Sequence, residues 1–114
     1  MSTIEIWHNN RCSKSRAAFN YLKEHDYSIV VREYLKELPS REELQLVLTK
    51  LNSKPSEIIR KKEKLFRELN LKDASEEELL EAMIKHPKLI ERPIVVRADR
   101  AIIARPLELI EEIL

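Results

Sequence analysis

The first 34 residues follow a strand–helix–strand pattern, which restricts the fold of this chain more than any other feature. Residues 3–7 alternate polar and apolar side chains, as a half-buried strand does. Apolar residues within 17–22 recur at the three- and four-residue spacing of a helix face. A β-branched run within 27–34 predicts a second strand. Because a strand, a helix and a strand over about thirty residues form a βαβ unit, we expect an α/β fold in which these two strands are parallel.

The middle of the chain predicts helices without strands. Ser and Glu form capping boxes at 40–43 and 75–78, and each should start an amphipathic helix. One shorter helix is expected over 55–60 and another over about 64–69, as their apolar residues recur at helical spacing. Residues 40–86 are therefore predicted to be an all-helical insertion.

The last part of the chain predicts a hairpin followed by a helix. Residues 94–96 and 101–104 are short apolar strands on either side of a turn. Pro106 fits the first position of a final helix, where its missing N–H costs nothing. The expected order is βαβ, helices, ββα, in a mixed sheet. A length of 114 residues suggests that 1–114 form a single domain.

Composition excludes several classes of protein. The 21 basic and 20 acidic residues nearly cancel, which gives no support for a nucleic-acid binder. No apolar run approaches the ~18 residues of a membrane span, and no export signal is recognisable, so a cytoplasmic location is expected. The chain has no glycine, which excludes glycine-rich nucleotide loops, and no His/Cys spacing that resembles a metal site. A monomer is the default expectation.

Cys12 is the one cysteine of the chain, and it falls where the first strand gives way to the helix. The first N–H groups of a helix are unpaired and carry partial positive charge, which favours a thiolate. Arg11, Lys14 and Arg16 should act in the same direction, as should His8 if protonated. The sequence therefore predicts a lowered pKa for the Cys12 thiol.

Two interpretations of this cysteine stand side by side. A lone cysteine is most often a small buried apolar residue. The polar and cationic neighbours of Cys12 favour an activated nucleophile instead, and Ser13 and Ser15 can donate hydroxyl hydrogen bonds to the sulfur or to a bound oxyanion. Since the chain has no second cysteine, any catalytic redox cycle needs an external thiol.

The segment His8-Asn9-Asn10-Arg11-Cys12-Ser13-Lys14-Ser15-Arg16 resembles the active-site segment of the arsenate reductases coupled to glutathione and glutaredoxin. The resemblance covers essentially the whole chain. It implies a thioredoxin-like, glutaredoxin-like fold with a helical insertion, and a role in arsenic detoxification. The best-known members carry Pro where this chain has Asn10 and Gly where it has Ser13.

The resemblance also implies roles for individual residues. It makes Cys12 catalytic, His8, Ser15 and Arg16 thiolate-tuning, and Arg60, Arg92 and Arg105 oxyanion-binding. Arginine suits an oxyanion because its planar guanidinium forms paired hydrogen bonds and stays charged. The other interpretation of Arg60 is a helical charge paired with Glu57 or Glu63. Pro93 follows a cis bond in the family's fold, whereas about 95% of X–Pro bonds are trans.

The chemistry that the resemblance implies is reduction of arsenate to arsenite. The Cys12 thiolate would attack arsenate, glutathione would act as co-substrate, and glutaredoxin would clear the resulting mixed disulfide, with no bound cofactor. Two alternatives remain open. One is a glutathione-linked thiol oxidoreductase that acts on another substrate. The other is an Spx-type regulator that binds RNA polymerase, although Ser15 stands where such regulators often have a second cysteine.

Overall fold

The chain consists of two compact units, each described here by itself. The computed structural model describes residues 3–25 and 27–114. The first unit comprises Met1–Glu37 and Arg92–Leu114, and the second comprises Leu38–Glu91. The helical insertion expected at 40–86 falls within the second unit, and the single domain over 1–114 stays a prediction.

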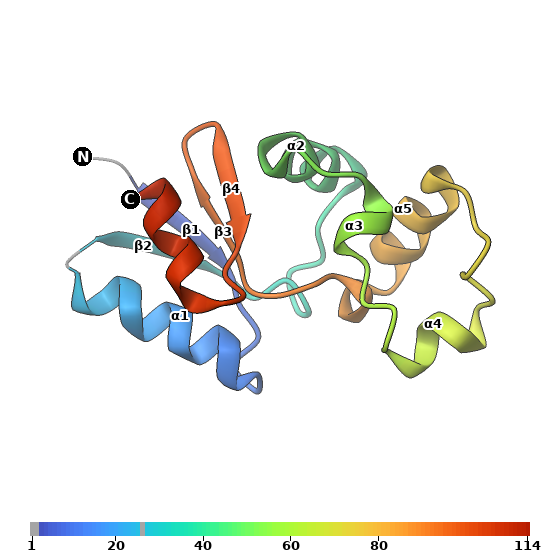
Figure 1. The fold of residues 1–114 in the computed structure, drawn as a ribbon, viewed down its shortest axis with the longest axis horizontal. Coiled ribbons are helices and arrows are strands. Elements are labelled where there is room, and N and C mark those ends of the chain that lie inside the picture. Colours follow the sequence, from blue (N-terminus) through green and yellow to red (C-terminus); the bar gives the residue numbers. More distant parts are fainter. Residues whose placement is uncertain (1–2, 26) are drawn as a thin grey trace. The chain divides into compact units, whose positions relative to one another are not determined.

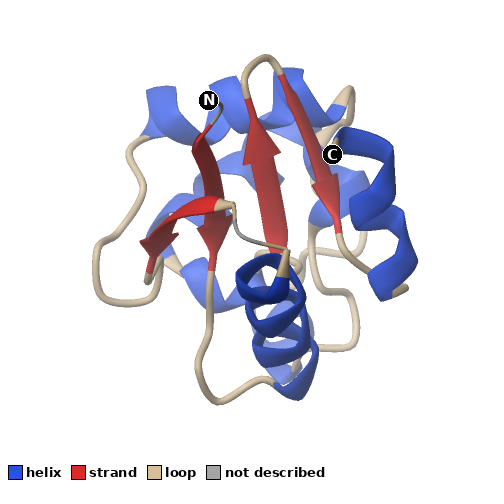
Figure 2. Cartoon of the chain, turned by 90° about the vertical axis from the view of Figure 1, so that its left-hand side faces the viewer, coloured by secondary structure: helices blue, strands red, loops and turns tan. Residues whose placement is uncertain are grey.

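The first unit is built on a four-stranded mixed sheet (Figures 1 and 2). Its elements are β1 (Thr3–Trp7), α1 (Ser13–Glu24), β2 (Ser28–Arg32), β3 (Ile94–Arg97), β4 (Arg100–Ile103) and the 3₁₀ helix η2 (Leu107–Ile113). The strand order is β2-β1-β3-β4. β1 pairs in parallel with β2, and β3 pairs antiparallel with both β1 and β4, so the predicted βαβ unit and the predicted hairpin are both confirmed.

The core of this unit joins α1 and η2 to the sheet. Alternation along β1 and the helical spacing in α1 bring their apolar side chains into one cluster. The fully or almost fully buried members of this cluster are Ile4, Ile6, Ala18, Leu22, Val95, Ala104, Ile110 and Ile113. The last helix is 3₁₀ rather than α, and Pro106 is its N-cap residue rather than its first helical residue. This part of the expectation was wrong, because Pro106 has an extended backbone with a ψ of 167°.

The second unit is helical. Its elements are α2 (Arg41–Leu51), α3 (Pro55–Ile58), α4 (Lys64–Glu68), α5 (Glu76–Lys85) and the 3₁₀ helix η1 (Pro87–Leu89). Both predicted capping boxes are confirmed, at the starts of α2 and α5. The guanidinium of Arg41 pairs with Glu77 and Glu81, so one cation on α2 holds two carboxylates of α5.

The short helix expected over 55–60 ends at Ile58. Ile59 forms an isolated antiparallel bridge with Ile90, and the Arg60 N–H donates to the Leu89 carbonyl at 2.7 Å. This pairing satisfies backbone groups that another helical turn would have used, and it buries Ile59 to 5% exposure and Ile90 to 0%. Arg60 therefore follows the helix instead of lying on it.

The N-cap of α5 provides a stability prediction. The Ser75 Oγ accepts a hydrogen bond from the Glu78 N–H at 3.1 Å, and Glu78 Oε1 accepts one from the Ser75 N–H at 3.0 Å. Ser75→Ala removes the first of these bonds and should lower the free energy of unfolding by about 1 kcal/mol in chemical denaturation. Ser75→Asp keeps a capping oxygen and should stay close to wild type. Equal losses in the two variants would contradict a capping role.

Candidate functional site

The sheet brings three distant parts of the chain to one end of the first unit. Trp7, at the end of β1, is in register with Ile94 at the start of β3, and Ile94 is in register with Ile103 at the end of β4. The segments just beyond these residues must therefore lie together. They carry Cys12 after β1, Arg92 before β3 and Arg105 after β4.

Cys12 is the N-cap residue of α1, which agrees with its predicted place at the strand–helix junction. The turn before it is closed by the Cys12 N–H, which donates to the Asn9 carbonyl at 3.0 Å. The Asn9 side chain accepts from the Arg11 N–H at 3.0 Å, and Arg16 Nη1 donates to the Asn10 carbonyl at 2.9 Å. The turn is thus fixed by its own asparagine and by a cation of the following helix.

Ser15 lies behind this turn and is completely buried. Its Oγ accepts a hydrogen bond from the Asn9 N–H at 3.0 Å and lies 2.7 Å from His8 Nδ1. We assign the Ser15 hydroxyl as the donor to a neutral His8, because burial, the largest effect, lowers the pKa of His8. The charge of Arg16 lowers it further, and only the charge of Glu33 opposes this. The Ser15 hydroxyl is therefore used within the turn instead of pointing at the sulfur.

Residue Cys12 is 8% exposed, and the pKa of its thiol is shifted downward, in the predicted direction. Burial is the largest single effect and raises the pKa. Together, the N–H of Ser15, the Arg92 guanidinium and the N–H of Lys14 outweigh it. The sulfur makes no regular N-cap hydrogen bond, yet these backbone N–H groups still favour the thiolate, as the start of a helix should.

The side-chain charges of the turn contribute less to the pKa of Cys12 than expected. Arg11, Lys14 and Arg16 were expected to lower the pKa of Cys12, but none of their side chains is among its main causes. Arg16 is engaged with the backbone of the turn. Arg11 and Lys14 are both exposed, which explains why their charges act little on a buried sulfur.

Arg92 and Arg105 lie beside the sulfur. Arg105 Nη2 is 3.6 Å from Cys12 Sγ, and Arg105 Nε donates to the Arg92 carbonyl at 2.7 Å. Arg92 acts on the thiolate through a hydrogen bond and through its charge, and its Nε and Nη1 are buried. The Arg92–Pro93 peptide bond is cis, as is Arg105–Pro106. The structure thus brings together one thiol and two guanidinium groups.

Arg60, the third predicted oxyanion ligand, belongs to the second unit. Its Nη1 donates to Glu63 Oε2 and to the Lys88 carbonyl, both at 3.2 Å. The Glu63 carboxylate also pairs with Lys88 Nζ at 3.7 Å. The pairing with Glu63 that the sequence left open is therefore present, and the role of Arg60 at the oxyanion stays a prediction.

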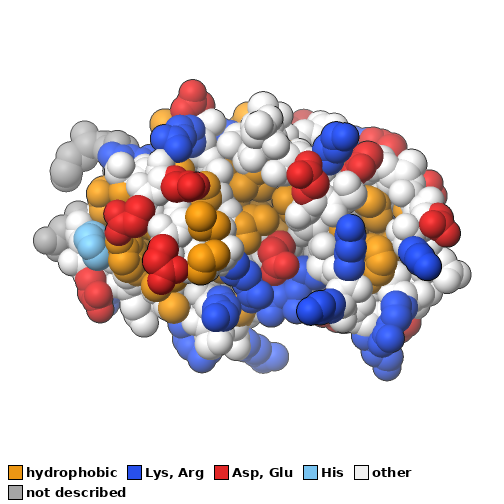
Figure 3. Space-filling view, viewed as in Figure 1, with side chains coloured by type: hydrophobic (Ala, Val, Ile, Leu, Met, Phe, Trp, Pro, Cys, Tyr) orange, Lys and Arg blue, Asp and Glu red, His pale blue; other side chains and the backbone are white. Residues whose placement is uncertain are grey.

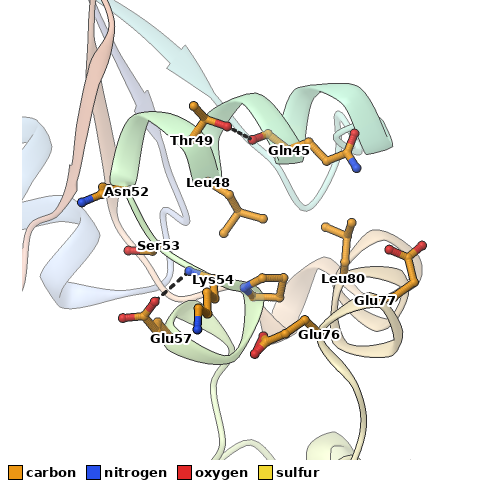
Figure 4. A pocket seen from close by; sticks show the side chains of 11 residues that line it. Gln45, Leu48, Thr49, Asn52, Ser53, Lys54, Glu57, Glu76, Glu77 and Leu80 are labelled. Atoms are coloured by element: carbon orange, nitrogen blue, oxygen red, sulfur yellow. Dashed lines mark hydrogen bonds between the residues drawn. The ribbon is translucent and has the colours of Figure 1, made fainter.

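A separate pocket of about 790 Å³ lies within the second unit (Figure 4). Two of the carboxylates that line it are held by hydrogen bonds: Glu57 accepts from the Lys54 N–H, and Glu76 accepts from the N–H and Oγ of Ser56. The lining contains neither cysteine nor histidine. We therefore place the candidate chemistry at Cys12.

Asn9 is the functional residue that the sequence interpretation missed. Through its carbonyl, side chain and N–H it contacts Cys12, Arg11 and Ser15. An asparagine just before a helix start is a known turn-former, since its side chain accepts from the N–H two residues on, so this signal was available in the sequence. In the described part of the chain, no cluster of three or more metal-ligating side chains is found, and no helix is long and apolar enough to cross a membrane.

Comparison with known proteins agrees with this geometry. The model of the ArsC family matches residues 7–113. The chain belongs to the ArsC family. It is 41% identical to a Neisseria meningitidis serogroup A protein named arsenate reductase, over the full length of both chains, and 45% identical to the Escherichia coli K12 protein YfgD, over 96% of this chain and 95% of that protein.

The solved structures agree with this assignment to the ArsC family. The structure of an arsenate reductase from Vibrio cholerae superposes on this ArsC-family chain with a TM-score of 0.95 at 42% identity. The match covers 99% of this chain and 98% of that one. The thioredoxin-like α/β fold implied by the family resemblance is confirmed by this match.

Proposed function

We propose that this ArsC-family protein reduces arsenate to arsenite, with Cys12 as the nucleophile. The observation that carries the proposal is the position of the Cys12 sulfur, at the start of a helix and beside the guanidinium groups of Arg92 and Arg105. The names of its relatives support the choice of arsenate among tetrahedral oxyanions.

The first step forms a bond between sulfur and arsenic. The Cys12 thiolate attacks arsenate and displaces one oxygen, which leaves as hydroxide or, after protonation, as water. Arg92 and Arg105 bind the remaining oxygens and neutralise the charge that develops on them during attack. Arg60 is proposed as the third oxyanion ligand, since its Nε and Nη2 make no hydrogen bond with any other described residue and form the edge that a guanidinium uses for paired bonds.

The second step reduces the arsenic. A glutathione thiolate attacks Cys12 Sγ, the sulfur–arsenic bond breaks with its electron pair left on arsenic, and arsenite departs. The two thiols have supplied two electrons and remain as a Cys12–glutathione disulfide. Glutaredoxin then takes the glutathione in a thiol–disulfide exchange that restores the Cys12 thiolate.

His8, Ser15 and Arg16 are proposed to tune the thiolate by holding the turn. Their contacts lie within residues 8–16, and they hold the turn that leads to Cys12. A neutral His8 fits this role, because its Nδ1 can accept the hydrogen bond from the Ser15 hydroxyl. The proposal includes glutathione as co-substrate and a monomeric protein without a bound cofactor. It also includes a cytoplasmic location, because reduced thiols persist in that compartment.

The test is an assay of NADPH oxidation with arsenate, glutathione, glutaredoxin and glutathione reductase. NADPH consumption should require arsenate, both thiol components and the protein. A folded protein that gives no arsenate-dependent consumption would contradict the proposal. If glutaredoxin nevertheless removes glutathione from Cys12, a thiol oxidoreductase for another substrate becomes the better assignment.

A further inference from the structure

The segment around Cys12 carries positive charge that the proposed mechanism does not use. The whole chain has a formal net charge of +1. Residues 6–22 contain no acidic residue, and their basic residues are Arg11, Lys14 and Arg16. A segment with a net charge of +3 in a nearly neutral protein makes a local field that an approaching anion would sense.

The cations near the sulfur fall into two groups. Arg92 and Arg105 act directly on the sulfur, and Arg16 is engaged with the Asn10 carbonyl. Arg11 and Lys14 are exposed and form no ion pair with any other residue in the described part of the chain. We call Arg11 and Lys14 the outer cations.

The outer cations are fixed to the turn through their backbones. The Arg11 N–H donates to Asn9 Oδ1, and the Lys14 N–H is one of the groups that stabilise the thiolate. They lie one residue before and two residues after Cys12. Figure 3 shows Lys and Arg side chains, in blue, beside the start of α1. Both residues therefore belong to the turn that holds the sulfur, and both are exposed to a molecule that approaches this turn.

We propose that Arg11 and Lys14 select a small thiol that carries carboxylates as the external reductant of Cys12. This inference rests on the proposed function, which needs an outside thiol because the described site contains a single cysteine. A carboxylate at about 7 Å from an exposed cation in water gains roughly two- to threefold in binding or rate, so two cations should give about four- to tenfold. The effect should disappear with added salt, since ions screen exposed charges.

The experiment measures disulfide exchange at Cys12 without arsenate. The Cys12 thiolate attacks a symmetric disulfide, one sulfur–sulfur bond forms as another breaks, and one thiolate leaves. The probes are dithiodiglycolate, hydroxyethyl disulfide and cystamine, which carry negative, zero and positive charge at similar size. Mass spectrometry gives each rate, and each is divided by the rate of the same probe with N-acetylcysteine amide to remove its intrinsic reactivity.

At low salt, the normalised rate should be highest for the anionic probe, lower for the neutral probe and lowest for the cationic probe. At high salt, the three normalised rates should converge. In the double variant Arg11→Gln/Lys14→Gln, the ratio of anionic to neutral rates should fall about four- to tenfold. The control Lys23→Gln/Arg100→Gln removes the same charge from exposed positions at the far ends of α1 and the β3–β4 hairpin, and it should keep the ratio. Glutathione disulfide should behave as the anionic probe does.

Two results would overturn the inference: an unchanged ratio in the Arg11/Lys14 variant, or no charge order in the wild-type protein at low salt. The second needs no variant, so misfolding cannot obscure it. Because arsenate is absent, these results do not depend on arsenate turnover, so the inference and the arsenate assignment can fail separately. If Cys12 reacts preferentially with anionic disulfides but the protein does not reduce arsenate, the inference stands and only the arsenate assignment is contradicted.

Discussion

Cys12→Ser is expected to abolish arsenate-dependent NADPH oxidation, a loss on the order of 10³-fold or more in turnover. A serine hydroxyl is a far weaker nucleophile than a thiolate, and it cannot form the disulfide through which the electrons leave. Arg92 and Arg105 would stay in place and still bind the oxyanion. The variant should therefore retain arsenate binding, measurable by calorimetry, while it loses turnover.

A matched control variant separates the effect of losing the thiol from the effect of changing its surroundings. Ser13→Ala changes the exposed neighbour of Cys12, whose hydroxyl makes no hydrogen bond with any described residue, and it should keep most of the activity. Thermal unfolding of Cys12→Ser should resemble that of the wild type, because one small side chain replaces another. Substantial turnover in Cys12→Ser would show that another group carries the chemistry.

The parts of the fold that follow from local pattern were predictable from the sequence. Strand alternation, helical spacing and the capping boxes each depend on residues close together in the chain, and all three are confirmed. Arg60 shows where such reasoning fails. Its helix was expected to continue, but Ile59 and Ile90 pair across about thirty residues, and a local pattern does not contain that partner.

The candidate site also has features that the local sequence predicts and features that depend on the tertiary structure. The strand–helix junction predicted the place of Cys12 and the direction of its pKa shift. The contributors differ from those expected, because a charge close in sequence acts weakly when its side chain points to solvent. Arg92, which is 80 positions away, acts strongly because the β3 register brings it back to the end of β1. The Ser15 hydroxyl was expected at the sulfur, and its burial between His8 and Asn9 also needed the tertiary structure.

Arg92→Ala is the second variant with a large expected effect, and it has two independent readouts. Arg92 lowers the pKa of Cys12 through a hydrogen bond and through its charge. Since the thiolate is the reactive form, the rate of alkylation by iodoacetamide rises with pH through this pKa. Without Arg92 the pKa rises, so the midpoint should move to higher pH and alkylation at neutral pH should slow. The second readout is kcat/KM for arsenate, which should fall about 10²- to 10³-fold when one oxyanion donor is lost.

Arg92→Lys separates charge from geometry in this prediction. Lysine keeps the positive charge that favours the thiolate, but it lacks the planar fork that binds two oxygens at once. Its alkylation midpoint should therefore stay closer to wild type than that of Arg92→Ala, while its kcat/KM for arsenate falls nearly as far. If both variants left the midpoint and kcat/KM unchanged, the hydrogen bond from Arg92 to the sulfur would have no part in activating Cys12. A shifted midpoint with unchanged kcat/KM would instead limit Arg92 to thiolate stabilisation and leave the oxyanion to Arg105 and other donors.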